Sequence, residues 1–267
     1  MIMNSSNYAP PNEVGPSTKN HLIMALLIPI VLLAGYAAVY ASAGRITLFV
    51  WLNHWMHTMP TWVWANITFL ADAAAVFGIA GLCLLRKERM VYAAILGGIV
   101  SAVVIRLLKI YFDDPRPPAV LNGALFETIG EAYRSKSFPS GHAATAFFVS
   151  GLMVAFWRSK TVYFLALLFG VLGSLSRVAA GVHWPTDILV GGAIGWLIGY
   201  SAGAFFQDRN YFGYAKRILV FVLSYVAAVF LIVYDPNMPH VMWPQALIAA
   251  VGVFGSLYYL AFRILKV

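Results

Sequence analysis

The stretch SRVAAGVHWPTDILVGG, residues 176–192, decides the fold and raises the functional question. Its last residues continue into an apolar run that is long enough to cross a bilayer, which takes about 20 residues. The same stretch nevertheless carries Arg177, His183 and Asp187. Because charged groups near hydrocarbon are costly, their presence in such a segment indicates a functional site.

The composition of the whole chain indicates a polytopic membrane protein. Of its 267 residues, 61% are hydrophobic and only 10% are charged, and the mean hydropathy is +0.78; a soluble domain carries about 25% charged residues. The formal net charge is +8, but no Lys/Arg run interleaves with exposed aromatic residues, so we do not expect a nucleic-acid partner. The single cysteine, Cys83, lies in an apolar run and gives no support to a disulfide or a cysteine-ligated metal.

The apolar segments predict an all-α fold, a polytopic membrane helix bundle. Residues 1–20 are polar and are predicted to be disordered, residues 21–207 to form a six-span core, and residues 208–267 to form an extra C-terminal helical hairpin. The aromatic segment 48–62 is expected to be an interfacial helix or loop. The eight candidate spans are 22–42, 61–85, 90–112, 140–157, 161–182, 185–206, 218–234 and 242–262.

The distribution of basic residues predicts the orientation, because short loops rich in Lys and Arg stay in the cytoplasm. With both termini inside, eleven of the eighteen basic residues lie on the cytoplasmic side. They are Lys19, Arg86, Lys87, Arg89, Arg158, Lys160, Arg209, Lys216, Arg217, Arg263 and Lys266. We therefore expect an integral membrane protein, in a bacterial inner membrane, with the other face toward the periplasm.

This orientation brings polar residues from five places in the sequence to the outer face. They lie at the end of the third span, in the loop after it, at the start of the fourth span, at the end of the fifth and at the start of the sixth. The residues are Lys109, Arg116, Ser140, Gly141, His142, Arg177, His183 and Asp187.

The chemistry of this set predicts a phosphate pocket. Lys109, Arg116 and Arg177 have no matching cluster of acids, and arginine binds phosphate oxygens in a bidentate manner. Ser140 and Gly141 begin a helix, whose free N–H groups and positive dipole end favour an anion.

The two histidines suggest how such a phosphate could react. Pro185 suits the first turn of a helix, which places His183 and Asp187 about one turn apart. A carboxylate there can hold the Nδ1 proton and leave Nε2 free to attack phosphorus. His142, on a different helix, could then protonate the leaving oxygen as a general acid.

Three blocks of the sequence resemble the signature of the type 2 phosphatidic acid phosphatase superfamily, K-x6-RP, PSGH and SR-x5-H-x3-D. Here they are KIYFDDPRP (109–117), PSGH (139–142) and SRVAAGVHWPTD (176–187), with every spacing matched. The resemblance implies a metal-independent phosphatase without a cofactor that works through a phosphohistidine. It also implies that His183 is the nucleophile, Asp187 its partner and His142 the proton donor, and that the cations with Ser140 and Gly141 bind the phosphoryl group.

We therefore expect a lipid phosphatase whose substrate is a lipid phosphate or diphosphate. Undecaprenyl diphosphate is favoured, followed by phosphatidylglycerol phosphate, phosphatidic acid and lipid A. A lipid phosphotransferase that uses the same intermediate is one alternative. A transporter is another, although it would spread its charges through both halves of the chain. The oligomeric state stays open.

Other polar residues have simpler explanations. Asp72 lies mid-span, and a structural ion pair with Arg106 is favoured over a role in substrate binding. His54 and His57 lack carboxylate or cysteine neighbours and are expected at the interface. The loop 118–138 either overhangs the site and selects head groups or is a flexible connector.

Overall fold

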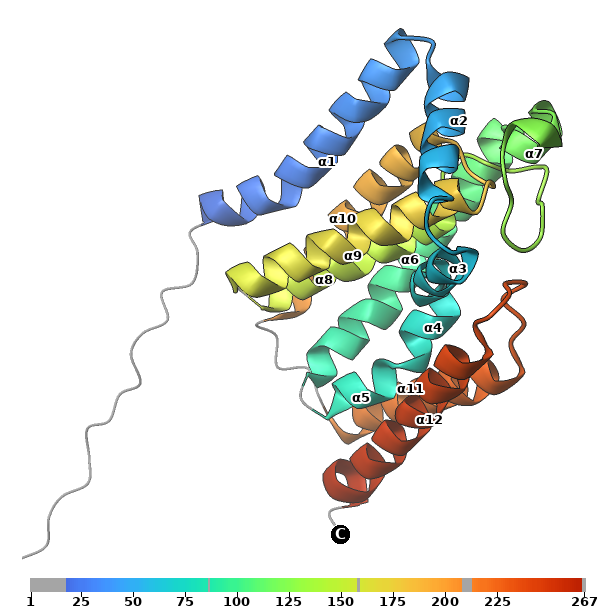
Figure 1. The fold of residues 1–267 in the computed structure, drawn as a ribbon. Helices are drawn as coiled ribbons and strands as arrows, with labels where there is room; N and C mark the ends of the chain where they lie inside the picture. The colour runs from blue at the N-terminus through green and yellow to red at the C-terminus, as the bar shows by residue number, and fades with distance from the viewer. Residues whose placement is uncertain (1–17, 86, 158, 208–212, 266–267) are drawn as a thin grey trace, which may run out of the picture.

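The computed structural model describes residues 18–85, 87–157, 159–207 and 213–265, and Figure 1 shows their arrangement. These residues contain helices and no strand, which confirms the predicted all-α class. The predicted disordered segment lies outside the described residues up to residue 17, and helix α1 begins at Thr18. The elements are α1 (Thr18–Ala41), α2 (Arg45–Met56), α3 (Thr61–Leu70), α4 (Ala73–Gly78), α5 (Ala80–Leu84), α6 (Glu88–Phe112), α7 (Pro117–Val120), η1 (Gly123–Leu125), α8 (Gly141–Phe156), α9 (Lys160–Ala179), α10 (Pro185–Gln207), α11 (Tyr214–Val233), α12 (Met242–Tyr259) and η2 (Leu260–Leu265).

Six helices in the described part of the chain are long and apolar enough to span a membrane, so the protein is membrane-embedded. They are α1, α6, α9, α10, α11 and α12. Helix α8 has only 16 residues but is apolar and largely buried within the bundle. These seven helices correspond to seven of the eight predicted spans.

Helix α8 forms the centre of the bundle. It packs most extensively against α10 and α9 and also contacts α6, while α1 lies against α10 (Figure 1). Gly195 and Gly199 allow this packing, because a methyl group at either position would overlap the carbonyl oxygen of Ala144 or Phe148 on α8. Small residues let membrane helices approach at backbone distance. Since Ser140 caps the start of α8 and Asp187 lies in the first turn of α10, this close contact sets the distance between two blocks of the signature.

The prediction of one continuous span over residues 61–85 was wrong. The segment forms three consecutive short helices, α3, α4 and α5, and the first break lies at Ala71 and Asp72. The Asp72 carboxylate accepts a hydrogen bond from the Ala74 N–H at 2.7 Å and so caps α4. Free N–H groups away from water need such a partner, and an aspartate that supplies it favours a new helix start.

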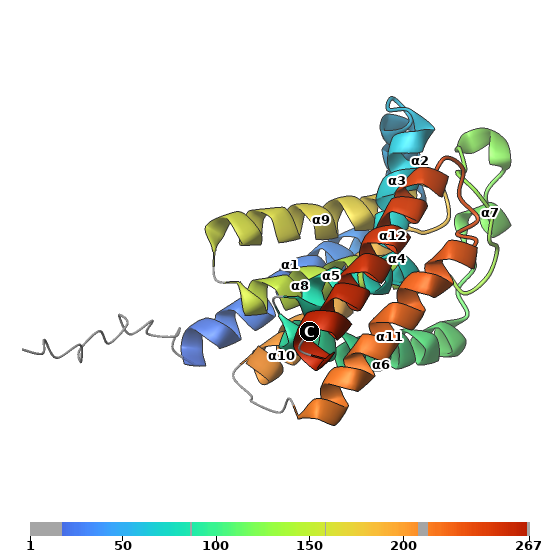
Figure 2. The ribbon, with the colours of Figure 1, turned by 90° about the horizontal axis from the view of Figure 1, so that it is seen from below.

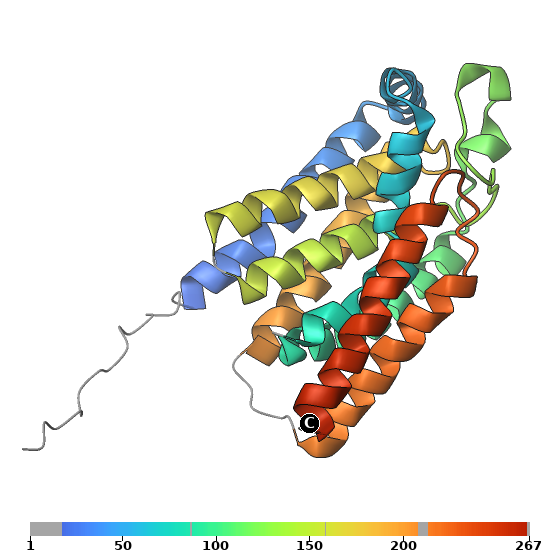
Figure 3. The same ribbon diagram turned by 60° about the horizontal axis from the view of Figure 1, so that its bottom comes forward.

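The C-terminal helices α11 and α12 form the predicted hairpin and lie side by side (Figures 2 and 3). They pack against α4 and α5. Gly252 on α12 lies so close to Gly78 on α4 that a methyl group there would overlap the Gly78 carbonyl. The hairpin therefore covers the broken segment 61–85 instead of standing apart from the core.

The connections 113–140, 180–184 and 234–241 gather at one end of the bundle, near α2 (Figure 1). The loop 118–138 has a defined conformation there. The N–H of Ile129 donates to the Ala180 carbonyl at 3.2 Å, and that of Glu131 donates to the Asn237 carbonyl at 3.3 Å. These bonds link the loop to two other connections, which argues against the flexible connector.

Helix α2 occupies most of the predicted interfacial segment 48–62 and anchors the same loop. Its buried Asn53 donates to the carbonyls of Glu127 and Val178 at 3.0 Å each and accepts from the Glu127 N–H. His57, which was expected at the membrane interface, lies at the C-terminal end of α2. Its side chain is only 5% exposed, with Nδ1 2.9 Å from the Glu127 carboxylate and Nε2 2.9 Å from the Ala179 carbonyl. His54 is exposed.

Candidate active site

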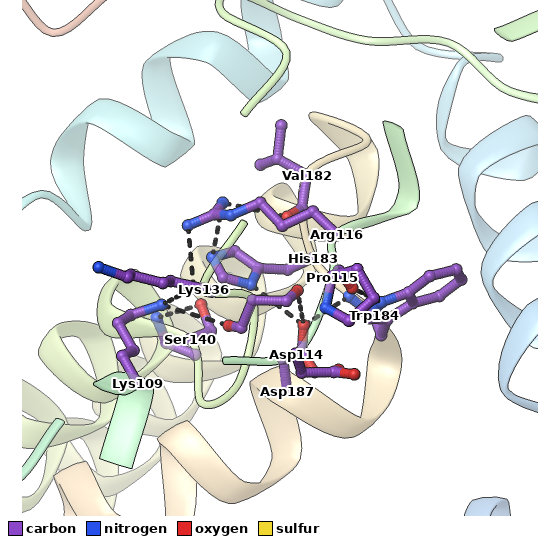
Figure 4. Close-up of polar contacts among 12 residues, drawn as sticks. Lys109, Asp114, Pro115, Arg116, Lys136, Ser140, Val182, His183, Trp184 and Asp187 are labelled. Atoms are coloured by element: carbon purple, nitrogen blue, oxygen red, sulfur yellow. Dashed lines mark hydrogen bonds and ion pairs between the residues drawn. The ribbon is translucent and has the colours of Figure 1, made fainter. Parts of the chain in front are cut away.

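His183 and Asp187 form a buried pair at the start of α10 (Figure 4). His183 lies in the connection before Pro185, and Asp187 is one turn later, with 2% and 0% of their side chains exposed. The Nδ1–H of His183 donates to Oδ2 of Asp187 at 3.2 Å, and the Trp184 N–H donates to the same oxygen at 2.9 Å. The carboxylate thereby fixes the ring tautomer, which leaves the lone pair on Nε2.

Ser137 is a third partner of this carboxylate that the sequence did not reveal. Its hydroxyl donates to Oδ2 of Asp187 at 2.5 Å, and the residue is fully buried. Ser137 itself is held by its N–H, which donates to the Asp114 carbonyl at 2.8 Å. Three donors thus converge on one carboxylate oxygen and fix the orientation of His183.

The Nε2 atom of His183 faces Arg116. The guanidinium Nη1 lies 3.3 Å from Nε2 and also donates to the Val182 carbonyl at 3.1 Å (Figure 4). Burial lowers the pKa of His183 well below its usual value near 6.5, and the positive charges of Arg116 and Lys109 lower it further. The ring is therefore neutral at physiological pH, with an available lone pair directed at a cationic pocket.

Arg177 supplies a buried cation with unused donors. It lies in the last turn of α9 and is 3% exposed. Within the described part of the chain, its Nε and Nη1 atoms are buried and have no hydrogen-bond partner. A buried charged donor without a partner is costly, so this geometry is typical of a site for an anionic ligand.

Lys109 and Arg116 hold the loop that closes the pocket. Lys109 Nζ donates to the carbonyls of Lys136 and Ser137 at 2.6 and 3.2 Å (Figure 4). Arg116 Nε donates to the Ser135 carbonyl at 2.8 Å, and its guanidinium lies over the Tyr133 ring. Both cations are thereby fixed beside His183.

Ser140 and Gly141 lie at the start of α8, beside the histidine pair. The Ser140 hydroxyl caps α8 by accepting from the Ala143 N–H at 3.4 Å, and the Ser140 N–H donates to the Asp187 carbonyl at 3.0 Å. The space around Gly141 is open, since a methyl group placed on it would lie 3.9 Å from the nearest neighbour, Ile105. The first turn of α8 can therefore direct N–H groups toward an anion.

His142 does not pair with the residues that bind His183. Its Nε2 lies 3.2 Å from Oδ2 of Asp72, which also accepts from the Tyr234 hydroxyl at 3.0 Å. The predicted pair between Asp72 and Arg106 was therefore wrong, because Asp72 faces the bundle interior and Arg106 is exposed. Among the described residues, no group of three or more His, Cys, Asp or Glu side chains is arranged to hold a metal ion.

An apolar cavity of about 390 Å³ adjoins His142. His142, Asp72 and Tyr234 form its polar end, and α4, α6 and α8 supply its apolar walls. Its apolar lining residues include Val76, Phe77, Ala102, Ile105 and Phe148. The site thus combines a cationic pocket with an adjacent apolar space.

Comparison with known proteins finds similarity to one family. Residues 89–211 match the model described as the PAP2 superfamily. The chain is 28% identical over 114 residues to undecaprenyl-diphosphatase BcrC of Bacillus subtilis, a match that covers 43% of this chain and 56% of the relative. It is 38% identical over 80 residues to phosphatidylglycerophosphatase B of the same organism, covering 27% of this chain and 39% of the relative. The chain thus spans about half or less of the length of these relatives.

The fold is similar to that of a solved structure as well. The crystal structure of Aquifex aeolicus LpxE superposes with a TM-score of 0.51 at 28% identity and covers 59% of this chain and 93% of that one. The region matched by the family model runs from the start of α6 into the segment after α10, and it contains all eight residues predicted for the site. Together with the similar fold, this match over residues 89–211 and the three signature blocks within it point to the PAP2 superfamily.

Proposed function

We propose that this protein is an integral membrane phosphatase that removes a phosphoryl group from a lipid phosphate or diphosphate through a phosphohistidine on His183. The observation that carries the proposal is the neutral imidazole, fixed by Asp187, whose Nε2 faces a pocket of cations. Arg177 contributes unused buried donors to this pocket. Such an arrangement suits an incoming phosphoryl group and a nucleophile directed at its phosphorus.

The proposed reaction has two steps. In the first, Nε2 of His183 attacks phosphorus, the P–N bond forms, and the P–O bond to the leaving group breaks as His142 donates a proton to the leaving oxygen. In the second, His142 accepts a proton from water while the water oxygen attacks phosphorus and the P–N bond breaks. Phosphate then leaves, and both histidines regain their initial protonation states. The three cations, Ser140 and Gly141 would stabilise the negative charge that develops on the phosphoryl oxygens.

The substrate we favour is undecaprenyl diphosphate, with phosphatidylglycerol phosphate, phosphatidic acid and lipid A as the next candidates. Two observations support a lipid. The apolar cavity beside His142 could receive part of an apolar tail, and the site lies at one end of a membrane bundle. The names of the similar proteins, undecaprenyl-diphosphatase and phosphatidylglycerophosphatase, agree with this class of substrate.

We further propose that residues 21–207 form the phosphatase core, that both termini lie in the cytoplasm, and that the site faces the periplasm of the inner membrane. The basic residues Lys87, Arg89 and Lys160 lie near the end of the bundle opposite the site, which is the distribution expected for a cytoplasmic face. Gly123→Cys, in a Cys83→Ser background, tests this orientation because Gly123 has open space around it at the site end. A membrane-impermeant maleimide should label it in intact spheroplasts but should not label Gly213→Cys, an open position at the other end. The reverse pattern would overturn the orientation.

The activity is tested by phosphate release from purified protein across the four lipids, with EDTA present. We expect turnover of at least one of them, abolished by His183→Ala and retained by Asp114→Asn, whose carboxylate pairs with Arg45 at the edge of the site. No release from any lipid would refute the phosphatase proposal, and turnover that excludes undecaprenyl diphosphate would refute the favoured substrate. Activity lost in EDTA and restored by a divalent cation would refute the expected metal independence.

A further inference from the structure

Asp72 joins three separate parts of the fold at one carboxylate. It lies at the break in segment 61–85, where it caps α4 through the Ala74 N–H. Its Oδ2 atom accepts from the hydroxyl of Tyr234, directly after α11, and contacts Nε2 of His142 in the first turn of α8. The Asp72 side chain is 13% exposed and that of His142 is 27% exposed, so the pair is largely shielded from water.

The surroundings of His142 explain why a carboxylate is needed there. A general acid must carry a proton before the leaving group departs. Burial, and after it the positive charges of Arg177 and Arg116, oppose a protonated His142 ring. The neutral imidazole of His183 does not offset these positive charges, whereas Asp72 provides a negative charge 3.2 Å from the His142 ring. With Nε2 held by Asp72, Nδ1 is the nitrogen left to donate a proton.

Tyr234 in turn holds Asp72, and the C-terminal hairpin holds Tyr234. The side-chain amide of Gln245, on α12, donates to the Tyr234 carbonyl at 2.6 Å and to the Leu231 carbonyl at 2.7 Å. These bonds close the hairpin at its site end. The position of the Tyr234 hydroxyl therefore depends on both helices of the hairpin, α11 and α12.

We propose that Asp72 and Tyr234 are positioning residues that hold His142 as the proton donor, so that the C-terminal hairpin is part of the active site. The inference rests on the proposed phosphatase function. The protein would then use two His–Asp pairs with opposite tasks. Asp187 orients the neutral His183 for attack, whereas Asp72 supports the protonated form of His142.

Leaving groups of different basicity provide the test. An alkyl phosphate, such as phosphatidic acid, needs a proton on its leaving oxygen, whereas p-nitrophenyl phosphate releases a stable anion without one. Asp72→Asn should lower kcat/KM for the alkyl ester, which reports the steps up to leaving-group departure, by about 10²-fold, within the range of general acid catalysis, and should change kcat/KM for the aryl ester far less. The basic limb of the pH–rate profile of Asp72→Asn should lie at lower pH than that of the wild type. Tyr234→Phe should act in the same direction, by about tenfold, because it removes one hydrogen bond to a charged group.

A second comparison separates positioning from a merely structural role. On a His142→Ala background, Asp72→Asn and Tyr234→Phe should cause no further loss of activity, because the effects of substitutions at residues that act through one another are not additive. Tyr225→Phe, which removes a hydroxyl from the same helix where its ring stacks on Phe221, should leave both rates unchanged.

The outcomes are distinguishable. Equal losses for the two esters, further losses on the His142→Ala background, or unchanged activity in Tyr234→Phe would overturn the positioning role while leaving the phosphatase function intact. If Asp72→Asn does not fold, Tyr234→Phe alone decides the question, since it keeps the cap on α4. A wild-type protein that hydrolyses neither these esters nor the lipid panel would instead refute the proposed function itself.

Discussion

Asp187→Asn tests the central electrostatic claim about the site, because the structure allows the charge to be removed while the geometry is kept. All three donors, from His183, Trp184 and Ser137, converge on Oδ2, whereas Oδ1 is buried and has no partner among the described residues. An amide oxygen can therefore take the place of Oδ2 and keep the tautomer, with the NH2 group in the place of Oδ1.

The magnitude follows from the distance between the two groups. When His183 attacks phosphorus its ring gains positive charge, and a carboxylate at 3.2 Å stabilises a full charge by about 5 kcal/mol at an effective dielectric constant of 20. Because the charge is incomplete in the transition state, we take about 4 kcal/mol, which corresponds to about a 10³-fold lower kcat. KM should change little, since Asp187 has no donor for the phosphate.

Steady-state phosphate release by purified Asp187→Asn, compared with Asp114→Asn, checks this prediction. The thermal unfolding of both variants in detergent must be measured too, because a buried NH2 group without a partner costs about 1–3 kcal/mol of stability. A folded Asp187→Asn protein with kcat within about tenfold of wild type, a difference of about 1.4 kcal/mol, would refute the reasoning.

Three further predictions follow from the same geometry. The kcat/KM for a soluble phosphate ester should have no acid limb centred at or above pH 6.5, because the lowered pKa of His183 keeps Nε2 unprotonated until well below that pH. An acid limb centred there would contradict this. Ser137→Ala should lower kcat by about tenfold through the loss of one hydrogen bond to a carboxylate, and an unchanged kcat would show that this bond does not orient Asp187. Gly195→Ala should destabilise the protein by about 3 kcal/mol in thermal unfolding because its methyl group meets the Ala144 carbonyl, whereas Gly123→Ala, in open space, should be neutral.

The phosphate-binding side of the site could be predicted from the sequence because its residues lie at span ends. Hydropathy places the ends of α6, α9 and α10 within a few residues, so Lys109, Arg177 and Asp187 can be assigned to one face without knowledge of any contact. The signature spacing also predicts that His183 and Asp187 lie close together, since they are one helical turn apart. Such local geometry follows directly from the sequence order.

The proton-donor side could not be predicted in this way. Segment 61–85 is largely apolar and Asp72 is its only charged residue, so hydropathy favours a continuous helix and a charge partner at a similar depth, such as Arg106. The break at Asp72 depends on the cap to Ala74 and on packing by the hairpin, both of which are tertiary features. Tyr234 is one of 14 tyrosines, and no spacing links it to His142. Ser137 precedes PSGH by only two residues, but the signature does not include it.

The two histidines show why the surroundings, and not the residue type, determine each task. Each ring has a nitrogen 3.2 Å from a carboxylate oxygen, yet Asp187 is fully buried and receives two additional donors on that oxygen, which fix it as an orienting group. Asp72 retains partial exposure and shares its oxygen with a tyrosine from the hairpin. Arg116 lies directly against Nε2 of His183, where it opposes protonation of the nucleophile. At His142, the Asp72 carboxylate offsets the positive charges of the same cations. The same cluster of cations can therefore lie beside both rings, because each ring has its own carboxylate, on a different element, that offsets their positive charge.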